Sequence, residues 1–309
     1  MKILFMGTPE FAVPCLKALI DNGHDVCGVV TQPDKPAGRG HKLTPPPVKV
    51  LAEESGLLVF QPESLKDFSF QSELQRLSPQ MIVVVAYGKI LPEYILNYPE
   101  LGCINMHASL LPKYRGAGPI QWSVINGEKV TGVTSMLMEK GLDTGDMLLK
   151  CETEIGEYET AGELHDRLMV LGAKLLIETV DAAENGQLRP EKQRDEDSCY
   201  APMISKETAK IDWKKSAREV SKLIAGMNPW PVAHTLYKGE TLKIYKAIVL
   251  EGKAGKPGQI IKADNDGILV VCGDGLTILA DEVQFFGSKR MKVRDYLNGH
   301  SIEEGTILE

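Results

Sequence analysis

The chain has 309 residues, which is enough for two domains with sizeable cores, and its 43% hydrophobic and 25% charged content is typical of a water-soluble globular protein. No apolar run approaches the roughly 18 residues that a membrane-spanning helix needs, and the first residues do not form a signal-peptide core. The net charge of −7 disfavours a wholly basic nucleic-acid-binding surface, and six scattered cysteines disfavour a disulfide framework or a zinc site. We therefore expect a cytoplasmic protein that needs neither a membrane nor a metal.

The first 31 residues predict a βαβ unit. Apolar runs at 2–6 and 25–31 flank an amphipathic stretch at 10–22, which is the order that opens a parallel sheet. The turn after the first run lacks the Gly-x-Gly-x-x-Gly pattern of dinucleotide-binding folds. The sequence therefore does not predict a dinucleotide cofactor.

A stretch rich in proline and glycine follows at 32–47, and we expect it to be a long irregular loop. Its only acidic residue is Asp34, and its basic residues include Arg39 and Lys42. Glycines on both sides of Arg39 would give the loop freedom to move. Taken alone, the pattern is more often that of a mobile surface loop with incidental charge.

The remaining elements predict an α/β domain followed by a small β domain. Helical patterns lie at 48–55, 91–96, 119–126, 160–185 and 216–226, and strand patterns at 81–85, 102–106, 130–138 and 146–154. Short β-prone runs at 241–250, 258–263, 267–271 and 276–283 predict a small barrel. We place a Rossmann-like, mostly parallel sheet domain at 1–189, a polar linker at 190–205 and the β domain at 206–309.

The strongest chemical signal is at the end of the strand predicted at 102–106. Asn105 and His107 are two residues apart and therefore share one face of that strand, and a carboxylate follows downstream at Asp143. An amide, an imidazole and a carboxylate at strand ends suit carbonyl polarisation and proton handling in acyl transfer. Without further context, a buried Asn/His pair that caps a strand end explains the pattern about as well.

The longer motif favours the catalytic interpretation. The pattern Asn-x-His-x-Ser-Leu-Leu-Pro-x-Tyr-Arg-Gly begins at Asn105, and Asp-Thr-Gly follows at Asp143. This combination resembles the formyltransferases that use 10-formyltetrahydrofolate. The segments at 3–12, 31–40 and 228–231, together with the C-terminal extension, are similar to the branch of that family that acts on methionyl-tRNA.

The resemblance implies a site and its partners. The implied catalytic residues are Asn105, His107 and Asp143, and the implied folate-binding residues are Ser109, Leu110, Leu111, Pro112, Tyr87 and Gly88. Arg39 and Lys42 would contact tRNA. The formyl donor would be 10-formyltetrahydrofolate, the acceptor initiator methionyl-tRNA and the other product tetrahydrofolate, on a monomer whose C-terminal barrel is OB-like. In this chemistry Asn105 polarises the formyl oxygen, His107 stabilises charge or donates a proton, and Asp143 orients the histidine or accepts the amine proton through water.

The charge distribution is compatible with a tRNA partner. Residues 206–256 carry 11 Lys/Arg against 5 Asp/Glu, whereas the chain as a whole is acidic. This asymmetry permits one basic face, although composition alone favours a solvated lysine-rich surface. Trp230 lies between Pro229 and Pro231, and we expect it to pack against the protein rather than stack on a base.

Three other functions remain open. A formyltransferase acting on a small amine, such as a phosphoribosylglycinamide or an amino sugar, would use the same trio without needing a basic C-terminal domain. A nucleotide-binding Rossmann protein is disfavoured by the missing glycine pattern. An RNA-binding protein that used only the C-terminal domain would leave the first 200 residues unexplained.

Overall fold

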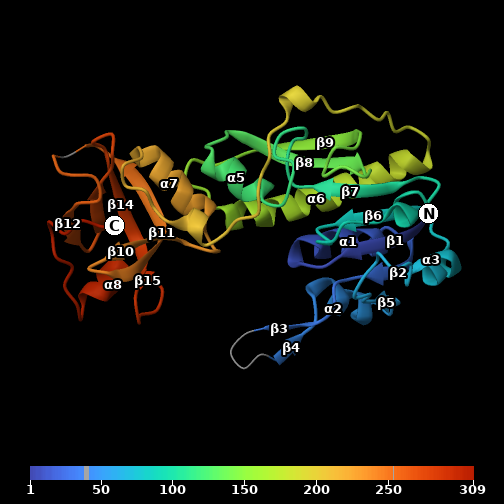
Figure 1. Cartoon of the computed structure of the whole chain (residues 1–309), viewed down its shortest axis with the longest axis horizontal. Helices are drawn as coiled ribbons and strands as arrows, with labels where there is room; N and C mark the ends of the chain where they lie inside the picture. The colour runs from blue at the N-terminus through green and yellow to red at the C-terminus, as the bar shows by residue number, and fades with distance from the viewer. Residues whose placement is uncertain (38–41, 253) are drawn as a thin grey trace. The chain divides into compact units, whose positions relative to one another are not determined.

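The computed structural model describes residues 1–37, 42–252 and 254–309, without the side chains of Ala37 and Lys42. The chain folds into two compact units, each assembled from separate segments. Unit 1 comprises Met1–Gly116, Thr131–Thr153 and His165–Tyr200, and unit 2 comprises Ala117–Val130, Glu154–Leu164 and Ala201–Glu309. Most of unit 2 is orange and red in Figure 1.

A seven-stranded sheet forms the centre of unit 1, in the order β5-β2-β1-β6-β7-β8-β9 (Figure 1). The strands are β1 (Lys2–Gly7), β2 (Asp25–Val30), β5 (Val59–Phe60), β6 (Met81–Val85), β7 (Cys103–His107), β8 (Val130–Leu137) and β9 (Met147–Glu154). Each neighbouring pair among the first five strands of this order, from β5 through β2, β1 and β6 to β7, is parallel, and β8 pairs antiparallel to β7. The predicted Rossmann-like, mostly parallel sheet is therefore confirmed.

The sequence of β6 explains its central place in this sheet. All five of its residues are apolar and buried, and four of them are β-branched, as expected for a parallel strand that is covered on both faces. Strand β7 is different, because its apolar start gives way to Asn105 and His107 at its carboxyl end. Ligands bind at this end of the strands in open α/β sheets.

The helices of this part of the chain follow the predicted apolar patterns, except the one at Gln71–Leu77, which was not predicted from the sequence. They are η1 (Glu10–Ala12), α1 (Val13–Asp21), α2 (Pro47–Glu54), α3 (Gln71–Leu77), α4 (Glu93–Leu96) and α6 (Ala161–Glu184). The long helix α6 buries Leu168, Leu175 and Leu176, and the Oγ1 of Thr179 donates a 2.9 Å hydrogen bond to the Oγ of Ser135 on β8. This bond fixes α6 against the strand beside β7.

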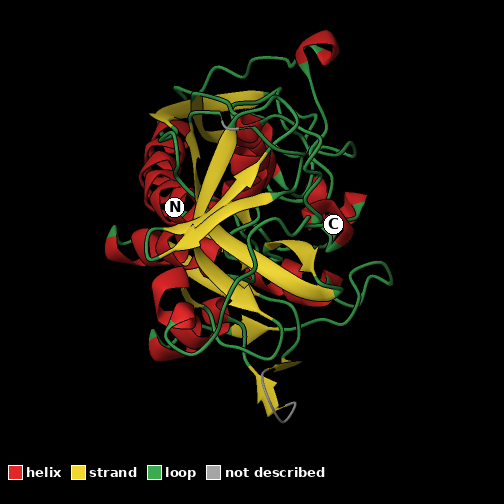
Figure 2. Cartoon of the chain, turned by 90° about the vertical axis from the view of Figure 1, so that its left-hand side faces the viewer, coloured by secondary structure: helices red, strands yellow, loops and turns green. Residues whose placement is uncertain are grey.

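The prediction of an irregular loop over 32–47 is wrong in part. Strands β3 (Lys35–Ala37) and β4 (Lys42–Thr44) form an antiparallel hairpin that projects from the rest of unit 1 (Figure 1, Figure 2). Pro36 is tolerated there because a two-stranded ladder has only edge strands, so that the missing N–H can face solvent.

An antiparallel sheet forms the centre of unit 2, in the order β10-β11-β14-β13-β12, and confirms the predicted C-terminal β domain. The strands are β10 (Ala233–Tyr237), β11 (Glu240–Leu250), β12 (Ile260–Asp264), β13 (Gly267–Val271), β14 (Thr277–Phe285) and β15 (Met291–Lys292), which pairs with β14. Residues 305–309 lie between the two edge strands: Leu236 of β10 exchanges backbone hydrogen bonds with Glu309, and Ile260 of β12 donates to Thr306. The sheet therefore closes on itself in the manner of a small barrel.

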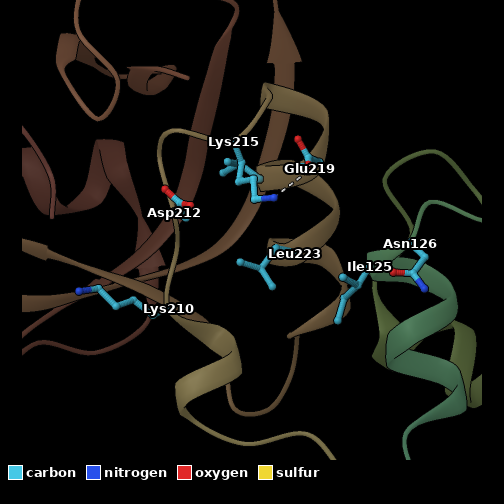
Figure 3. A pocket seen from close by; sticks show the side chains of 8 residues that line it. Ile125, Asn126, Lys210, Asp212, Lys215, Glu219 and Leu223 are labelled. Atoms are coloured by element: carbon cyan, nitrogen blue, oxygen red, sulfur yellow. Dashed lines mark ion pairs between the residues drawn. The ribbon is translucent and has the colours of Figure 1, made fainter. Parts of the chain in front are cut away.

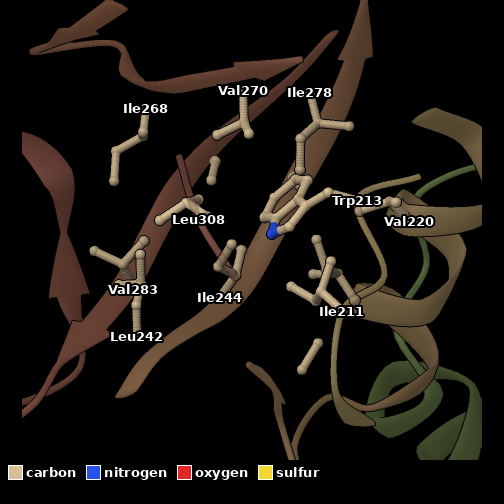
Figure 4. Close-up of a cluster of buried hydrophobic side chains, with 14 of the residues drawn as sticks. Ile211, Trp213, Val220, Leu242, Ile244, Ile268, Val270, Ile278, Val283 and Leu308 are labelled. Atoms are coloured by element: carbon tan, nitrogen blue, oxygen red, sulfur yellow. The ribbon is translucent and has the colours of Figure 1, made fainter. Parts of the chain in front are cut away.

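Apolar side chains from the whole of unit 2 fill the space inside this sheet (Figure 4). Trp213 lies among Ile244 and Ile278, is 5% exposed, and donates its indole N–H to the Oγ1 of Thr235 at 2.9 Å. A buried indole with a satisfied N–H contributes a large apolar area without an unpaired donor. This core therefore gives unit 2 a hydrophobic centre of its own.

Unit 2 also contains the helices α5 (Pro119–Ile125), α7 (Ala217–Gly226) and α8 (Val293–Leu297) and the short 3-10 helix η3 (Glu207–Ala209). Helix α7 begins with a capping box, in which the Ser216 hydroxyl accepts from the Glu219 N–H and the Glu219 carboxylate accepts from the Ser216 N–H. Helices α5 and α7 approach closely, since a Cβ on Gly226 would come within 2.4 Å of the Ile125 side chain.

The prediction that Trp230 packs against the protein is wrong. Its side chain is 58% exposed, whereas its neighbours Asn228 and Pro231 are buried. Pro229 is exposed as well, so that Pro229 and Trp230 form the exposed part of the turn after α7.

Candidate active site

The carboxyl end of β7 presents two functional side chains. Asn105 and His107 alternate with Met106 and therefore share a face of the sheet. The side chain of Asn105 is partly exposed and makes no hydrogen bond to the described residues. An amide on a rigid strand without a protein partner is available to a ligand.

Two contacts fix the imidazole of His107, whose side chain is 6% exposed. Its Nε2 lies 2.8 Å from the carbonyl oxygen of Tyr114, and its Nδ1 lies 3.7 Å from Oδ2 of Asp143. Because a carbonyl oxygen can only accept, Nε2 must carry a proton and donate it to Tyr114. Nδ1 is therefore the nitrogen that remains to exchange a proton with a substrate.

A strained turn between β8 and β9 delivers Asp143. Its backbone has φ 53°, in the left-handed region that non-glycine residues rarely adopt, and its Oδ2 accepts a 2.8 Å hydrogen bond from the N–H of Gly116. Gly145 is required two residues later, because a Cβ there would lie 1.8 Å from the carbonyl oxygen of Leu137. In the Asp-Thr-Gly pattern, the aspartate therefore supplies the carboxylate, and the glycine is needed because a side chain would not fit.

The predicted folate loop follows β7 and is held by hydrogen bonds of its own. The Ser109 hydroxyl donates to the carbonyl of Lys113 at 2.6 Å, and the N–H of Leu111 donates to Thr134 Oγ1 at 3.1 Å. Leu111 is buried, whereas Leu110 and Pro112 are partly exposed. The serine hydroxyl is therefore engaged within the turn, and the apolar side chains of the loop provide the partly exposed surface.

Tyr87 and Gly88 follow β6. The Tyr87 ring is 1% exposed and belongs to the core, where burial raises the pKa of its hydroxyl to about 12. Its carbonyl accepts from Gln32 Nε2 at 2.9 Å. Gly88 is exposed with φ 79°, and a Cβ on it would lie 2.6 Å from the same amide nitrogen of Gln32. Of these two predicted folate-binding residues, only Gly88 is exposed to solvent, and the Tyr87 ring is buried in the core.

The structure also places a residue at the site that sequence reasoning missed. Gln193 Nε2 donates to the carbonyls of Asp143 (2.8 Å) and Gly145 (2.7 Å), and its Oε1 accepts from Arg115 Nε at 3.0 Å. It lies in the polar stretch after α6, which we interpreted as part of a linker. No local sequence pattern marks it, because its partners lie about fifty or more residues earlier in the chain.

Of the two predicted tRNA-binding residues, only Lys42 has a described backbone, at the start of β4. Arg39 is outside the described residues, and so is the side chain of Lys42. The base of the hairpin is anchored by Asp34, whose carboxylate accepts hydrogen bonds from Gln61 Nε2 and from Lys49 Nζ, each at 2.9 Å. These two donors, with Gln61 contributing more, hold the pKa of Asp34 below its usual range.

A separate cavity of about 580 Å³ lies within unit 2 (Figure 3). It is lined by Ile125, Asn126, Lys210, Asp212, Lys215, Glu219, Val220 and Leu223. Lys215 and Glu219 are paired across 3.4 Å, so that the lining charges are mixed and partly neutralised. The cavity contains none of the trio and is not the candidate catalytic site.

Among the described residues, no group of three or more His, Cys, Asp or Glu side chains is arranged to hold a metal ion. Within the same residues, no helix is long and apolar enough to cross a membrane. The groups at the site are therefore an amide, an imidazole, a carboxylate and backbone N–H groups, which can donate to a developing oxyanion and move protons.

Comparison with known families agrees with this chemistry. The family model described as "Formyl transferase" matches residues 1–180, and "Formyl transferase, C-terminal domain" matches residues 203–301. The chain belongs to the formyl transferase family, which confirms the predicted class of enzyme.

Individual relatives narrow the comparison. The chain is 55% identical over 309 residues to the methionyl-tRNA formyltransferase of Alkaliphilus oremlandii, covering 100% of this chain and 99% of that protein. It is 56% identical over 311 residues to the protein of the same name from Caldanaerobacter subterraneus, with 100% of both covered. Its fold is similar to that of an N-formyltransferase from Helicobacter canadensis in complex with folinic acid and dTDP-3-aminofucose, with a TM-score of 0.70, 20% identity, and coverage of 93% of this chain and 100% of that one.

Proposed function

We propose that this chain transfers the formyl group of 10-formyltetrahydrofolate to the free amino group of methionyl-initiator tRNA, giving N-formylmethionyl-tRNA and tetrahydrofolate. The observation that carries this proposal is the 55% identity, over the full length of both chains, to a relative named for that activity. Identity that extends through both family regions favours tRNA over a small amine, because it includes the C-terminal domain.

The trio supplies the groups that formyl transfer needs. The neutral amine attacks the formyl carbon, the C–O double bond becomes an oxyanion, and the bond to N10 of the folate breaks as that nitrogen takes up a proton. Asn105 donates an N–H to the oxyanion, and His107 contributes a proton or positive charge through Nδ1. The 3.7 Å between Nδ1 and Oδ2 is too long for a direct hydrogen bond. Asp143 therefore acts on the imidazole through its charge, or accepts the amine proton through water.

The folate is proposed to bind beside the loop that follows β7. This loop would contribute backbone groups and an apolar wall through Ser109, Leu110, Leu111 and Pro112. After Tyr87, Gly88 would contribute solvent-exposed backbone groups. The side-chain hydroxyl of Ser109 already donates within the loop, which leaves its backbone as the group for the ligand.

Unit 2 and the β3–β4 hairpin are proposed to hold the tRNA. The excess of basic residues over 206–256 supports electrostatic binding, which should weaken steeply as salt rises. Arg39 would guide the acceptor end, with Lys42 beside it, because a guanidinium can pair bidentately with a phosphate. Arg39→Ala should therefore impair the use of methionyl-tRNA without changing folate affinity, and Arg39→Lys should restore only part of the loss. Equal damage to folate binding would instead place Arg39 in the folate pocket.

The decisive test is a direct assay. Purified protein is incubated with 10-formyltetrahydrofolate and methionyl-initiator tRNA, and N-formylmethionyl-tRNA is measured; a parallel reaction contains an amino-sugar nucleotide as acceptor. Formylation of the tRNA alone is the expected result, and formylation of the sugar alone would reassign the substrate. We further propose a cytoplasmic location and a monomeric state; sedimentation of the purified protein would test the monomer.

A further inference from the structure

The side chain of Gln193 forms hydrogen bonds to both loops of the candidate site, the turn that carries Asp143 and the loop that contains Arg115. The amide nitrogen of Gln193 donates to two carbonyls of the Asp143 turn, at 2.8 Å and 2.7 Å. Its amide oxygen accepts from Arg115 Nε at 3.0 Å. Arg115 lies between Tyr114, whose carbonyl accepts from His107, and Gly116, whose N–H donates to Asp143.

The Asp143 turn needs such support. A non-glycine residue at φ 53° persists only where surrounding contacts hold it, because its side chain makes this backbone conformation unfavourable. The Gln193 amide bonds the carbonyl of Asp143 itself and that of Gly145, and therefore fixes the turn on both sides of Thr144. If this clamp were lost, the turn could relax and move the Asp143 carboxylate relative to His107.

The link to Arg115 extends the clamp to the second loop. Arg115 is 11% exposed in its side chain and also pairs with Asp195 at 2.9 Å. Its backbone N–H donates to the carbonyl of Cys199 at 3.0 Å, so the same stretch that carries Gln193 holds the loop by main chain as well. Gln193 therefore joins the turn that carries the Asp143 carboxylate to the loop whose Tyr114 carbonyl accepts a hydrogen bond from His107.

We infer that Gln193 is a positioning residue for the formyl-transfer reaction: it acts through Asp143, by clamping the Asp143–Gly145 turn against the Arg115 loop, and does not touch the substrate. This inference rests on the proposed function. It goes beyond the trio because it assigns a role to a residue outside every motif that the sequence displays.

The test compares Gln193→Met with Gln187→Met. Methionine keeps the length of glutamine and removes both hydrogen-bonding functions, and Gln187 is an exposed glutamine of the same stretch whose side chain makes no hydrogen bond to the described residues. A displacement of about 1 Å in a catalytic group can cost about a hundred-fold in rate. We expect Gln193→Met to lower kcat by about 10- to 100-fold with KM for both substrates within about threefold, and Gln187→Met to change neither.

Two further measurements separate positioning from a general structural role. In an Asp143→Ala background, adding Gln193→Met should lower the residual single-turnover rate by less than about twofold, because the effect passes through Asp143. Gln193→Glu keeps an acceptor for Arg115 but has no N–H for the two carbonyls, so its kcat should fall at least as far as that of Gln193→Met.

Three results would overturn the inference. These are an unchanged kcat in Gln193→Met, a full additional loss in the Asp143→Ala background, and normal kcat in Gln193→Glu. The last variant also provides the test if Gln193→Met does not fold, as judged by circular dichroism. Inactivity of the native protein on methionyl-tRNA would instead refute the proposed function, so the two failures are distinguishable.

Discussion

Polar contacts hold the candidate site of unit 1 in place, whereas apolar side chains hold unit 2 together. At the end of β7, backbone N–H and carbonyl groups fix His107 and Asp143, and the Asp143 turn is strained. In unit 2, Trp213 and the strands around it form an apolar cluster, in which the indole N–H of Trp213 is satisfied by Thr235. The two regions should therefore respond differently to mutation. Loss of a polar contact at the end of β7 should lower kcat, and loss of an apolar side chain in unit 2 should lower the free energy of unfolding.

The largest expected effect is on the stability of unit 2. Trp213→Ala should destabilise the protein by about 3–5 kcal/mol, because it leaves a cavity and removes the bond to Thr235. Trp230→Ala is the matched control, since that indole is 58% exposed and its removal should cost well under about 1 kcal/mol. Denaturant unfolding of both variants measures the difference. Similar losses in the two would mean that the cluster is not the stabilising centre.

The next largest effect is on turnover at β7. Asn105→Ala, His107→Ala and Asp143→Ala should each lower kcat by at least about a hundred-fold, by analogy with the loss of an oxyanion-stabilising group, while the fold survives. Met106→Leu, on the opposite face of the same strand, conserves volume and should leave kcat nearly unchanged. Steady-state kinetics measures kcat for each variant, and circular dichroism checks that each variant is folded. Near-normal turnover in His107→Ala would remove the histidine from the mechanism.

A smaller effect is expected at the start of α7. Ser216→Ala should cost about 1 kcal/mol, because the Glu219 N–H loses its acceptor and the Glu219 carboxylate loses the hydroxyl donor, while the backbone N–H of residue 216 is kept. Ser301→Ala, an exposed serine whose side chain makes no hydrogen bond to the described residues, should be silent. Thermal unfolding measures both. A silent Ser216→Ala would show that packing alone fixes the start of this helix.

The smallest effect concerns the cysteines and pH. Burial raises the pKa of Cys15, Cys103 and Cys272 to about 12, with Asp274 adding to the shift at Cys272, so these thiols stay protonated near pH 8. A thiol-alkylating reagent should therefore label the exposed Cys199 first, as mass spectrometry of the native protein would report. Because the folded pKa values lie above those of free thiols, their contribution to stability is complete at neutral pH and is lost as the pH rises towards 12. Rapid labelling of Cys15 in folded protein would contradict this.

The sequence predicted best where a local pattern decides the structure. Strand β6 is an unbroken apolar run and forms at the predicted residues, and helix α6 follows its leucine spacing. The β3–β4 hairpin was missed because its prolines and glycines are typical of loops, and the short ladder that tolerates Pro36 leaves no local signal.

Within the site, the sequence predicted which groups meet but not how they are held. The spacing placed Asn105 and His107 on one face and offered Asp143 as a downstream carboxylate, and the family resemblance favoured the catalytic interpretation of all three. The strained φ of Asp143, the N–H of Gly116 and the amide of Gln193 could not be predicted, because each depends on backbone geometry or on a distant contact.

The interleaving of the two units along the chain has a consequence for how such proteins can be inherited and recombined. Unit 2 draws α5 and the start of α6 from segments that lie before the main C-terminal stretch, and Gly226 of α7 accommodates Ile125 of α5 at close range. A genetic exchange of the codons after residue 200 would bring a new barrel but keep the old α5. Gly226 and Ile125 would then come from different parents. We therefore expect functional chimaeras to need the 117–130 segment from the same parent as the barrel.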